Sequence, residues 1–385
     1  MNIAFFSDSY LPYTSGVVRS IETFSAEFRR LGHKVYIFAP DYPNCPKIEN
    51  VFRFKSMPSL AHKDFTLAIP ISPNLERTIQ ALKIDLIHVH SPFLLGRLGA
   101  KAAKKVKIPL VYTYHTLYDQ YVHYVPFAQN FSRWIVRKVS KDFCNICDLV
   151  VTPTSDIEKL LRQYGVFTDI QTIPTGIDLK GYLDGDSTWL KEKFFIPKEK
   201  KVLLYVGRLG AEKNLDFLLE AFKDINNKMP NSTLVLVGGG PQEKYYKELC
   251  STMNLKDKII FTGTLNRKKV IDAYLGADLF VFASVTETQG LVLGEAQAAG
   301  LPIVAVEAFG TKEMVTPEFD GFLTQLSQKD FVSKVLNLLT DPVLYAKFSK
   351  NAKISVESIS AFNSAKKLLS AYEKILDKKS RANVV

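Results

Sequence analysis

The sequence predicts an α/β protein with two doubly wound domains, each built on a parallel sheet. Short β-rich runs alternate with helical patterns along the chain, as expected when helices cover both faces of such a sheet. The pattern breaks at a Pro- and Gly-containing segment, "TIPTGIDLKGY" (172–182), and then restarts. The 385 residues also exceed what one typical core holds. We therefore expect one domain over residues 1–175 and another over 176–360, facing each other across a ligand-binding cleft.

The first domain opens with a strand, "NIAFFS", and a helix that Gly32 ends. The helix has apolar residues at helical spacing, namely Val17, Ile21, Phe24, Phe28 and Leu31. Further strands are expected at "KVYIFAP", "DLIHVHSP", "LVYTYH" and "LVVTPT". Several of these strands end in polar pairs: Ser7-Asp8, His90-Ser91 and His115-Thr116. Ligands of open α/β sheets bind outside the carboxyl ends of the strands, so we expect chemistry at these positions.

The second domain repeats the pattern. Its expected strands are "VLLYVGR", "TLVLVGGGP", "KIIFTG", "DLFVFAS" and "PIVAV", with a helix from Asn214 to about Lys228 after the first of them. From Asp341 onward the tail is helical without a strand.

Composition and charge narrow the classes of function. The chain is 46% hydrophobic, has no apolar run long enough to span a bilayer, and begins without a basic leader, so we expect a cytoplasmic protein. The net charge of +11 favours binding to an anionic partner. Because no RNA-binding aromatic signature or helix-turn-helix cue accompanies it, we expect no nucleic acid, which leaves a membrane or a phosphate-rich substrate. The charge is spread along the chain, for example in "RKK" (267–269), and much of it is interpreted as solvated helix surface.

Metal and dinucleotide cofactors are not expected. Cys144 and Cys147 form a lone C-x-x-C without a second pair, which is more typical of a packed helix end than of a zinc site. "VGGGPQEK" (237–244) departs from G-x-G-x-x-G at Glu243, so it does not support a dinucleotide fingerprint. Its glycines, such as Gly238, could still bring backbone close to a ligand.

Two cations follow the first strand of the second domain. In "VGRLGAEKN", Arg208 and Lys213 precede the helix expected from Asn214. Free backbone N–H groups and the dipole at a helix N-terminus, together with two cations, make a phosphate site. The alternative is a pair of ordinary surface cations.

Two glutamates, Glu287 and Glu295, lie eight residues apart in "SVTETQGLVLGEAQAAGLP" (284–302). With Glu287 in a loop and Glu295 in the helix that ends at Gly300, both could point toward one crevice. A loop carboxylate beside the backbone of Gln289, Gly290, Leu291 and Val292 suits sugar hydroxyls, and a deeper one suits a ribose diol. The alternative is a solvated glutamate and a glutamate paired within the helix.

The stretch "SVTETQGLVLGEAQAAGLPIVA", preceded by "VGRLGAEKNLDFLLEAF" and "IPTGID", resembles the retaining glycosyltransferases of family 4. The resemblance implies the GT-B fold, in which two Rossmann-like domains face a cleft. It also implies that 1–175 binds the acceptor, that 176–360 binds the nucleotide-sugar donor, and that a final helix, about 361–385, crosses back onto the first domain.

The resemblance also assigns roles. Glu287 and the backbone of Gln289, Gly290, Leu291 and Val292 would bind the transferred sugar, and Glu295 the ribose. Arg208 and Lys213 would hold the diphosphate, His115 would lie near the sugar, and Gly16 would lie over the phosphates. Many relatives have two glycines where this chain has Ser15 and Gly16. The leaving diphosphate can itself take the acceptor's proton, and the two cations make a metal unnecessary, so the UDP-sugar is a co-substrate and no cofactor is expected.

The acceptor is suggested by residues 113–141. This segment is rich in aromatic residues and then turns basic, with Arg133, Trp134, Arg137 and Lys141 placed to meet an anionic bilayer. The alternative is a helix that packs in the core while its cations face water. "YHTLYDQYVHYVP" (114–126) is similar to bacterial diacylglycerol glucosyltransferases of this family. We therefore expect UDP-glucose, diacylglycerol and a peripheral position on the inner face of the cell membrane, with acceptor contacts from Asp8, Tyr118, Tyr121 and Tyr124.

Three other functions stay open at this point. The acceptor could be phosphatidylinositol, a polyprenyl-linked saccharide or a soluble sugar or sugar phosphate. The chain could be a sugar-nucleotide-binding module without transfer, or it could be a sugar-nucleotide epimerase.

Overall fold

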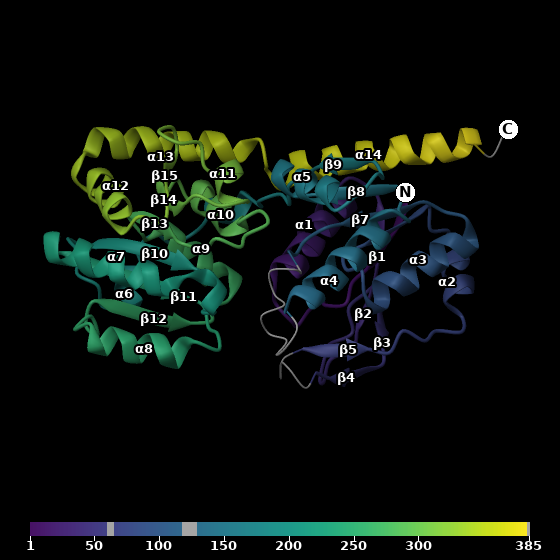
Figure 1. Cartoon of the computed structure of the whole chain (residues 1–385), viewed down its shortest axis with the longest axis horizontal. Coiled ribbons are helices and arrows are strands. Elements are labelled where there is room, and N and C mark those ends of the chain that lie inside the picture. The colour runs from purple at the N-terminus through teal and green to yellow at the C-terminus, as the bar shows by residue number, and fades with distance from the viewer. Residues whose placement is uncertain (60–64, 118–128, 383–385) are drawn as a thin grey trace. The chain divides into compact units, whose positions relative to one another are not determined.

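The computed structural model describes residues 1–59, 65–117 and 129–382, with the backbone alone for 129–133 and 382. The chain forms two compact units (Figure 1). The first comprises Met1–Gly176 together with Ala361–Val385, and the second comprises Ile177–Ser360. Both are α/β units with parallel sheets, as the alternating pattern predicts.

The first unit contains a seven-stranded parallel sheet in the order β3-β2-β1-β6-β7-β8-β9. Its strands are β1 (Asn2–Phe6), β2 (Lys34–Pro40), β3 (Val51–Phe54), β6 (Leu86–Val89), β7 (Leu110–Thr113), β8 (Leu149–Thr152) and β9 (Ile170–Thr172). A small antiparallel pair joins β4 (Ser56–Pro58) to β5 (Thr66–Ala68). The helices are α1 (Gly16–Arg30), α2 (Leu75–Ala81), α3 (Leu94–Val106), α4 (Gln129–Cys144), α5 (Ser155–Gln163) and α14 (Ala361–Ala382).

The second unit contains a six-stranded parallel sheet in the order β12-β11-β10-β13-β14-β15. Its strands are β10 (Lys201–Val206), β11 (Ser232–Val237), β12 (Ile259–Gly263), β13 (Leu279–Phe282), β14 (Ile303–Val306) and β15 (Gly321–Thr324). The longer helices are α7 (Leu215–Lys228), α8 (Glu243–Thr252), α9 (Arg267–Leu275), α10 (Leu291–Ala298), α12 (Gln328–Thr340) and α13 (Pro342–Glu357). The short ones are α6 (Trp189–Lys193), α11 (Thr311–Met314) and the 3₁₀ turns η3 (Lys180–Tyr182) and η4 (Ala211–Lys213).

Each sheet reverses its strand order at one point. In the first sheet the reversal lies between β1 and β6, and in the second it lies between β10 and β13. The loops that follow these strands diverge, which leaves room for a ligand at the carboxyl edge. The predicted site residues after β1, β7, β10 and β13 therefore lie at or next to the positions where such folds bind ligands.

The final helix, α14, belongs to the first unit, as the family resemblance implies. It packs beside α1 on one face of the sheet, and its buried residues join that core: Ala365, Leu368, Leu369, Ala371 and Tyr372 (Figure 1). The other face is covered by α3, where Gly99 packs directly on the Phe6 ring. This helix follows the 184 residues of the second unit (177–360), and it nevertheless completes the core of the first.

We predict that Leu368→Ala destabilises the first unit by about 2–5 kcal/mol, because it removes a fully buried side chain and leaves a cavity. Lys367→Ala, at the exposed neighbouring position, is the matched control and should change little. Urea unfolding followed by circular dichroism measures both. Equal stability of the two variants would contradict the assignment of α14 to this core.

Candidate functional site

Loops at the carboxyl edge of the second sheet carry the predicted phosphate-binding cations. Arg208 follows β10 as an exposed side chain, and its carbonyl accepts a hydrogen bond from Tyr205 Oη (3.1 Å). Lys213 ends the 3₁₀ turn η4, just before α7. Its ammonium forms an ion pair with the half-buried Glu287 carboxylate. This pair connects the loop after β10 to the loop after β13.

The loop that carries Glu287 packs against the segment around Gly310 and is hydrogen-bonded to it. The Gly310 N–H donates to the Glu287 carbonyl (3.0 Å), and a Cβ at Gly310 would lie 2.7 Å from the Gln289 backbone. Gly290 has φ of +78° and directly precedes α10. The predicted sugar-binding backbone, from Gln289 to Val292, therefore spans this turn and the first residues of α10, where helix N–H groups have no partner within the helix.

Glu295 lies on α10 and is only 6% exposed. Its Oε1 pairs with Arg267 Nη1 at 2.5 Å, and its Oε2 lies 3.1 Å from Tyr274 Oη. A buried carboxylate is tolerated only when it is paired and hydrogen-bonded, and these two contacts meet that need. Burial alone would lower the pKa of Arg267, but the charge and hydrogen bond of Glu295, together with Tyr182 and Tyr274, outweigh it, and the net pKa is raised. Both glutamates thus have partners inside the protein.

Two of the three cations in "RKK" (267–269) have carboxylate partners within the protein. Arg267 is the partner of Glu295, and Lys269 pairs with the fully buried Asp272 at 3.0 Å. Spacing does not reveal the Arg267–Glu295 contact, because the two residues lie on different helices, whereas Lys269 and Asp272 are three residues apart on α9 and form a pair that helical spacing does predict. One signal was available: Arg267 follows β12 much as Arg208 follows β10.

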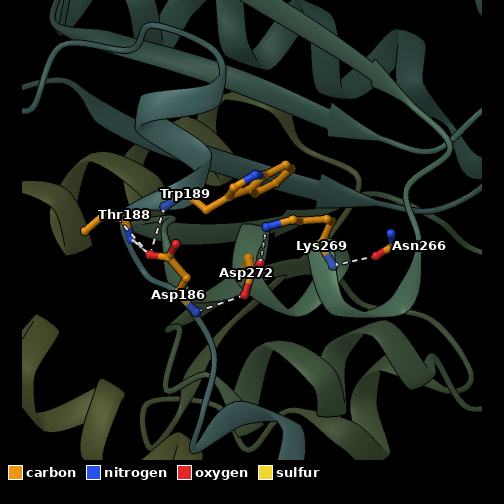
Figure 2. A network of polar contacts seen from close by, with 6 residues as sticks. All are labelled: Asp186, Thr188, Trp189, Asn266, Lys269 and Asp272. Carbon is orange, nitrogen blue, oxygen red and sulfur yellow. Dashed lines mark hydrogen bonds and ion pairs between the residues drawn. The ribbon is translucent and has the colours of Figure 1, made fainter.

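A second group of polar contacts anchors the helix that carries Arg267 (Figure 2). Asn266 caps α9 by accepting from the Lys269 N–H (3.0 Å), and the Asp186 N–H donates to Asp272 Oδ1 (2.9 Å). The Lys269 ammonium lies 4.6 Å from the centre of the Trp189 ring. The last two contacts join α9 to Asp186, just before α6, and to Trp189, the first residue of α6, and they position the helix that carries Arg267.

Two predicted glycine contacts have different surroundings. Gly238 has φ of +132°, and a Cβ there would lie 2.0 Å from the Gly207 carbonyl oxygen, so packing between the loops after β10 and β11 already requires glycine. Gly16 is the first residue of α1, and a Cβ there would meet no atom of the described chain within 4 Å. Ser15, which replaces the second glycine of many relatives, caps α1 by accepting from the Val18 N–H (3.3 Å).

Asp8, a predicted acceptor contact, stands at the end of β1. Its carboxylate accepts from Ser91 Oγ (2.5 Å) and from the Leu95 N–H (2.7 Å) at the start of α3. Burial raises the pKa of Asp8 despite these hydrogen bonds. The carboxylate thus caps a helix N-terminus, and its contact with an acceptor stays a prediction.

His115 follows β7, and its Nε2 lies 2.9 Å from His90 Nδ1. Burial lowers the pKa of His115 to about 3, so its imidazole is neutral near pH 7. His90 was placed at a strand end by the sequence but was not named as a site residue.

Part of the predicted acceptor and membrane surface lies outside the described residues, namely Tyr118, Tyr121, Tyr124 and the Arg133 side chain. On the described part of α4, Trp134 is 57% exposed and has the Lys138 ammonium 5.3 Å from its ring centre. Arg137 is exposed and stacks on the Tyr164 ring at 5.1 Å. Lys141 is half-buried, so the predicted cationic stripe is partly packed against its own unit.

The described residues include neither a metal-binding cluster nor a membrane-spanning helix. No group of three or more His, Cys, Asp or Glu side chains there is placed to hold a metal ion. Within the same residues, no helix has the length and apolar run required to cross a bilayer. Cys144 and Cys147 are buried at the end of α4, and burial raises the pKa of the Cys144 thiol to about 12.

Family models match both units. Residues 14–180 match the family described as Glycosyltransferase Family 4, and residues 186–355 match Glycosyl transferases group 1. The chain is 33% identical to the alpha-monoglucosyldiacylglycerol synthase of Acholeplasma laidlawii over 99% of each sequence. It is also 33% identical to the synthase of the same name from Streptococcus pneumoniae, over 79% of this chain and 71% of that one.

Solved structures share the fold. The structure of HepE from Anabaena in complex with UDP superposes with a TM-score of 0.77, at 20% identity over 97% of this chain and all of that one. At this identity the likeness concerns the fold alone.

We predict that Arg267→Met destabilises the second unit by roughly 2–4 kcal/mol, because the buried Glu295 carboxylate loses its cation. This loss is smaller than that expected for a fully buried pair, since the Arg267 side chain is 30% exposed. Glu295→Gln in the Arg267→Met background should recover much of the loss. Urea unfolding of the two single variants and the double variant measures the coupling. Additive effects would contradict the pairing.

Proposed function

The chain belongs to glycosyltransferase family 4 and has the GT-B fold, and on this premise we propose that it transfers glucose from UDP-glucose to 1,2-diacylglycerol with retention of configuration. The product would be an α-glucosyl glycolipid. The second unit would bind the donor and the first the acceptor.

The proposal that the second unit binds the sugar donor rests on two carboxylate–cation contacts at the carboxyl edge of its sheet. Lys213 pairs with Glu287 and Arg267 pairs with Glu295 on segments that follow β10, β12 and β13, and the exposed Arg208 also follows β10. Carboxylates suit sugar and ribose hydroxyls, and cations suit a diphosphate, so the set matches each part of a nucleotide sugar.

The Lys213–Glu287 pair suggests how the donor enters. A diphosphate held by Arg208 would compete for the Lys213 ammonium, because two phosphate groups carry more charge than one carboxylate. Glu287 would then be released to accept hydrogen bonds from the sugar. Glu295, held by Arg267 and Tyr274, would keep its place and receive the ribose hydroxyls.

The transfer step needs few protein groups. The acceptor hydroxyl would attack the anomeric carbon from the face that the diphosphate leaves, and a phosphate oxygen would take the hydroxyl proton. Arg208, Lys213 and nearby backbone N–H groups would stabilise the charge that develops on the diphosphate, and loss of one such donor typically costs about 3–4 kcal/mol. No metal is needed for this step. His115, Gly16, Gly238 and the backbone from Gln289 to Val292 would complete the donor site.

The lipid acceptor is supported by the relatives and by the surface of the first unit. Two of the relatives that match over most of their length are named as synthases of a glucosylated diacylglycerol. Large apolar side chains are exposed on α4 and near its end: Trp134, Ile135, Ile146 and Phe167. The last two are linked by Asn145, whose Oδ1 accepts from the Phe167 N–H (3.0 Å). Exposed aromatic and aliphatic residues beside Arg137 and Lys138 suit the interface of an anionic bilayer.

We predict that Lys213→Ala lowers kcat roughly 100- to 1000-fold, because it removes charge stabilisation from the leaving group. Glu295→Gln should lower kcat/KM for UDP-glucose about 10- to 100-fold, the value of a charged hydrogen bond. Transfer of radiolabelled glucose measures both. The exposed pair Lys244 and Glu248 on α8 supplies the controls Lys244→Ala and Glu248→Gln, which should retain wild-type rates. Wild-type rates in Lys213→Ala would show that the donor site is misplaced.

We predict that reversal of Arg133, Arg137 and Lys141 to Glu weakens binding to anionic vesicles at least tenfold, because each cation near the surface contributes about 1 kcal/mol. Vesicle flotation measures the bound fraction. Reversal of Lys193, Lys198 and Lys244, exposed cations of the second unit, makes the same change in net charge and should have the smaller effect. Equal effects in both variants would assign the binding to net charge alone and remove α4 from the proposal.

A further inference from the structure

Three imidazoles stack on one face of the first sheet. His88 and His90 alternate along and just beyond β6, and His115 follows the neighbouring strand β7. The rings of His88 and His90 lie 4.5 Å apart between centres, and those of His90 and His115 lie 5.2 Å apart, each pair tilted by 20°. The stack runs from the core beneath α14 to the carboxyl edge of the sheet.

The hydrogen bonds divide the stack into two parts. His88 uses both ring nitrogens within the core, with Nδ1 on the Tyr372 hydroxyl and Nε2 at 2.7 Å from Thr113 Oγ1. His90 uses Nδ1 for His115 Nε2 at 2.9 Å. Its own Nε2 is buried and has no hydrogen-bond partner among the described residues. The hydrogen bond between His90 and His115 is therefore separate from the network that holds His88.

These contacts select one arrangement of protons. Burial disfavours the charged form of both rings, so each is neutral and carries one proton. One ring must donate to the other, and the donor in turn determines which nitrogen of each ring is protonated. If His115 donated, the proton of His90 would be on the buried Nε2 as an unsatisfied N–H. If His90 donates from its Nδ1 to His115 Nε2, the buried Nε2 of His90 carries only an unused lone pair. The proton of His115 is then on its own Nδ1.

We propose that His90 is a positioning residue for the transfer reaction. Its Nδ1–H donates to His115 Nε2, fixes the plane of that ring and keeps the His115 proton on Nδ1. His115 then serves as a hydrogen-bond donor to the sugar rather than as a base. The inference rests on the proposed function for its consequence in catalysis, whereas its structural part, the position of the proton, is independent of activity.

The inference is specific to the hydrogen bond rather than to the packing of His90. Phe5 packs edge-on against both His88 and His90, at 5.4 and 4.8 Å between ring centres, so both imidazoles have similar apolar neighbours. If His90 acted only by packing, changes that disturb His88 and changes that disturb His90 should alter activity to the same extent. Of these two imidazoles, His90 is the one that is hydrogen-bonded to His115, whereas His88 is bonded to Tyr372 and Thr113.

The test compares two variants of His90 with one control. In His90→Asn the side-chain amide lies near the place of Nδ1 and can still donate to His115, whereas in His90→Gln it lies near the place of Nε2 and cannot. Tyr372→Phe removes the hydroxyl from His88 and leaves the His90–His115 bond intact, so it is the matched control for the loss of a buried hydrogen bond in the same stack. ¹⁵N NMR of the six histidines of the full-length protein gives the protonated nitrogen of each ring, and His115→Asn assigns the signals of His115.

We expect wild-type His115 to be protonated on Nδ1. His90→Gln should lose this single tautomer and lower kcat about 10- to 100-fold with little change in the KM for UDP-glucose, the range seen when a functional histidine loses its outer partner. His90→Asn should restore most of the tautomer signal and of kcat, and Tyr372→Phe should lower stability while leaving both unchanged.

A wild-type His115 protonated on Nε2 would overturn the inference, as would equal kcat values for His90→Gln and Tyr372→Phe. If the protein transfers no glucose at all, the proposed function fails, and the NMR result still decides where the proton lies.

Discussion

The architecture at the carboxyl edge of the second sheet follows from one constraint, the burial of the Glu295 carboxylate. Its helix is enclosed by the core, so the charge must be compensated within the protein, and Arg267 supplies that compensation from α9. The position of α9 must then be fixed: Asn266 caps the helix, Asp272 joins it to Asp186 just before α6, and Lys269 lies over the Trp189 ring at the start of α6. A single buried charge thus determines how three segments of the second unit meet.

The second carboxylate–cation pair has different properties. Lys213 and Glu287 lie on loops, are half-buried, and join the two strands at which the sheet reverses its order. The side-chain exposures of the two pairs are similar, 16% and 19% for Lys213 and Glu287 against 30% and 8% for Arg267 and Glu295, so the pairs differ in position rather than in burial. In the proposed function, the Arg267–Glu295 pair between helices defines where the ribose would lie, and the Lys213–Glu287 pair between turns is the one that a diphosphate would open.

The sequence predicts the fold well because the central strands are long apolar runs and their carboxyl ends are polar. It does not predict the short, half-exposed β3 and β9, or β15, which begins with glycine, because such segments lack a clear pattern. The motif singles out Glu287 and Glu295 as candidates, but it does not single out Arg267. The role of Arg267 depends on its contact with Glu295, a residue 28 positions away in sequence on another helix. The same holds for His90, whose importance lies in its contact with His115 across two strands.

The central claim is that this family-4 glycosyltransferase glucosylates a membrane lipid. The most direct measurement is transfer of radiolabel from UDP-glucose in mixed micelles that contain diacylglycerol, with and without an anionic lipid. The account predicts a labelled product that extracts into organic solvent, formed faster when the anionic lipid is present. Label that stays in the aqueous phase on a soluble sugar, or a converted donor in the absence of any acceptor, would contradict it.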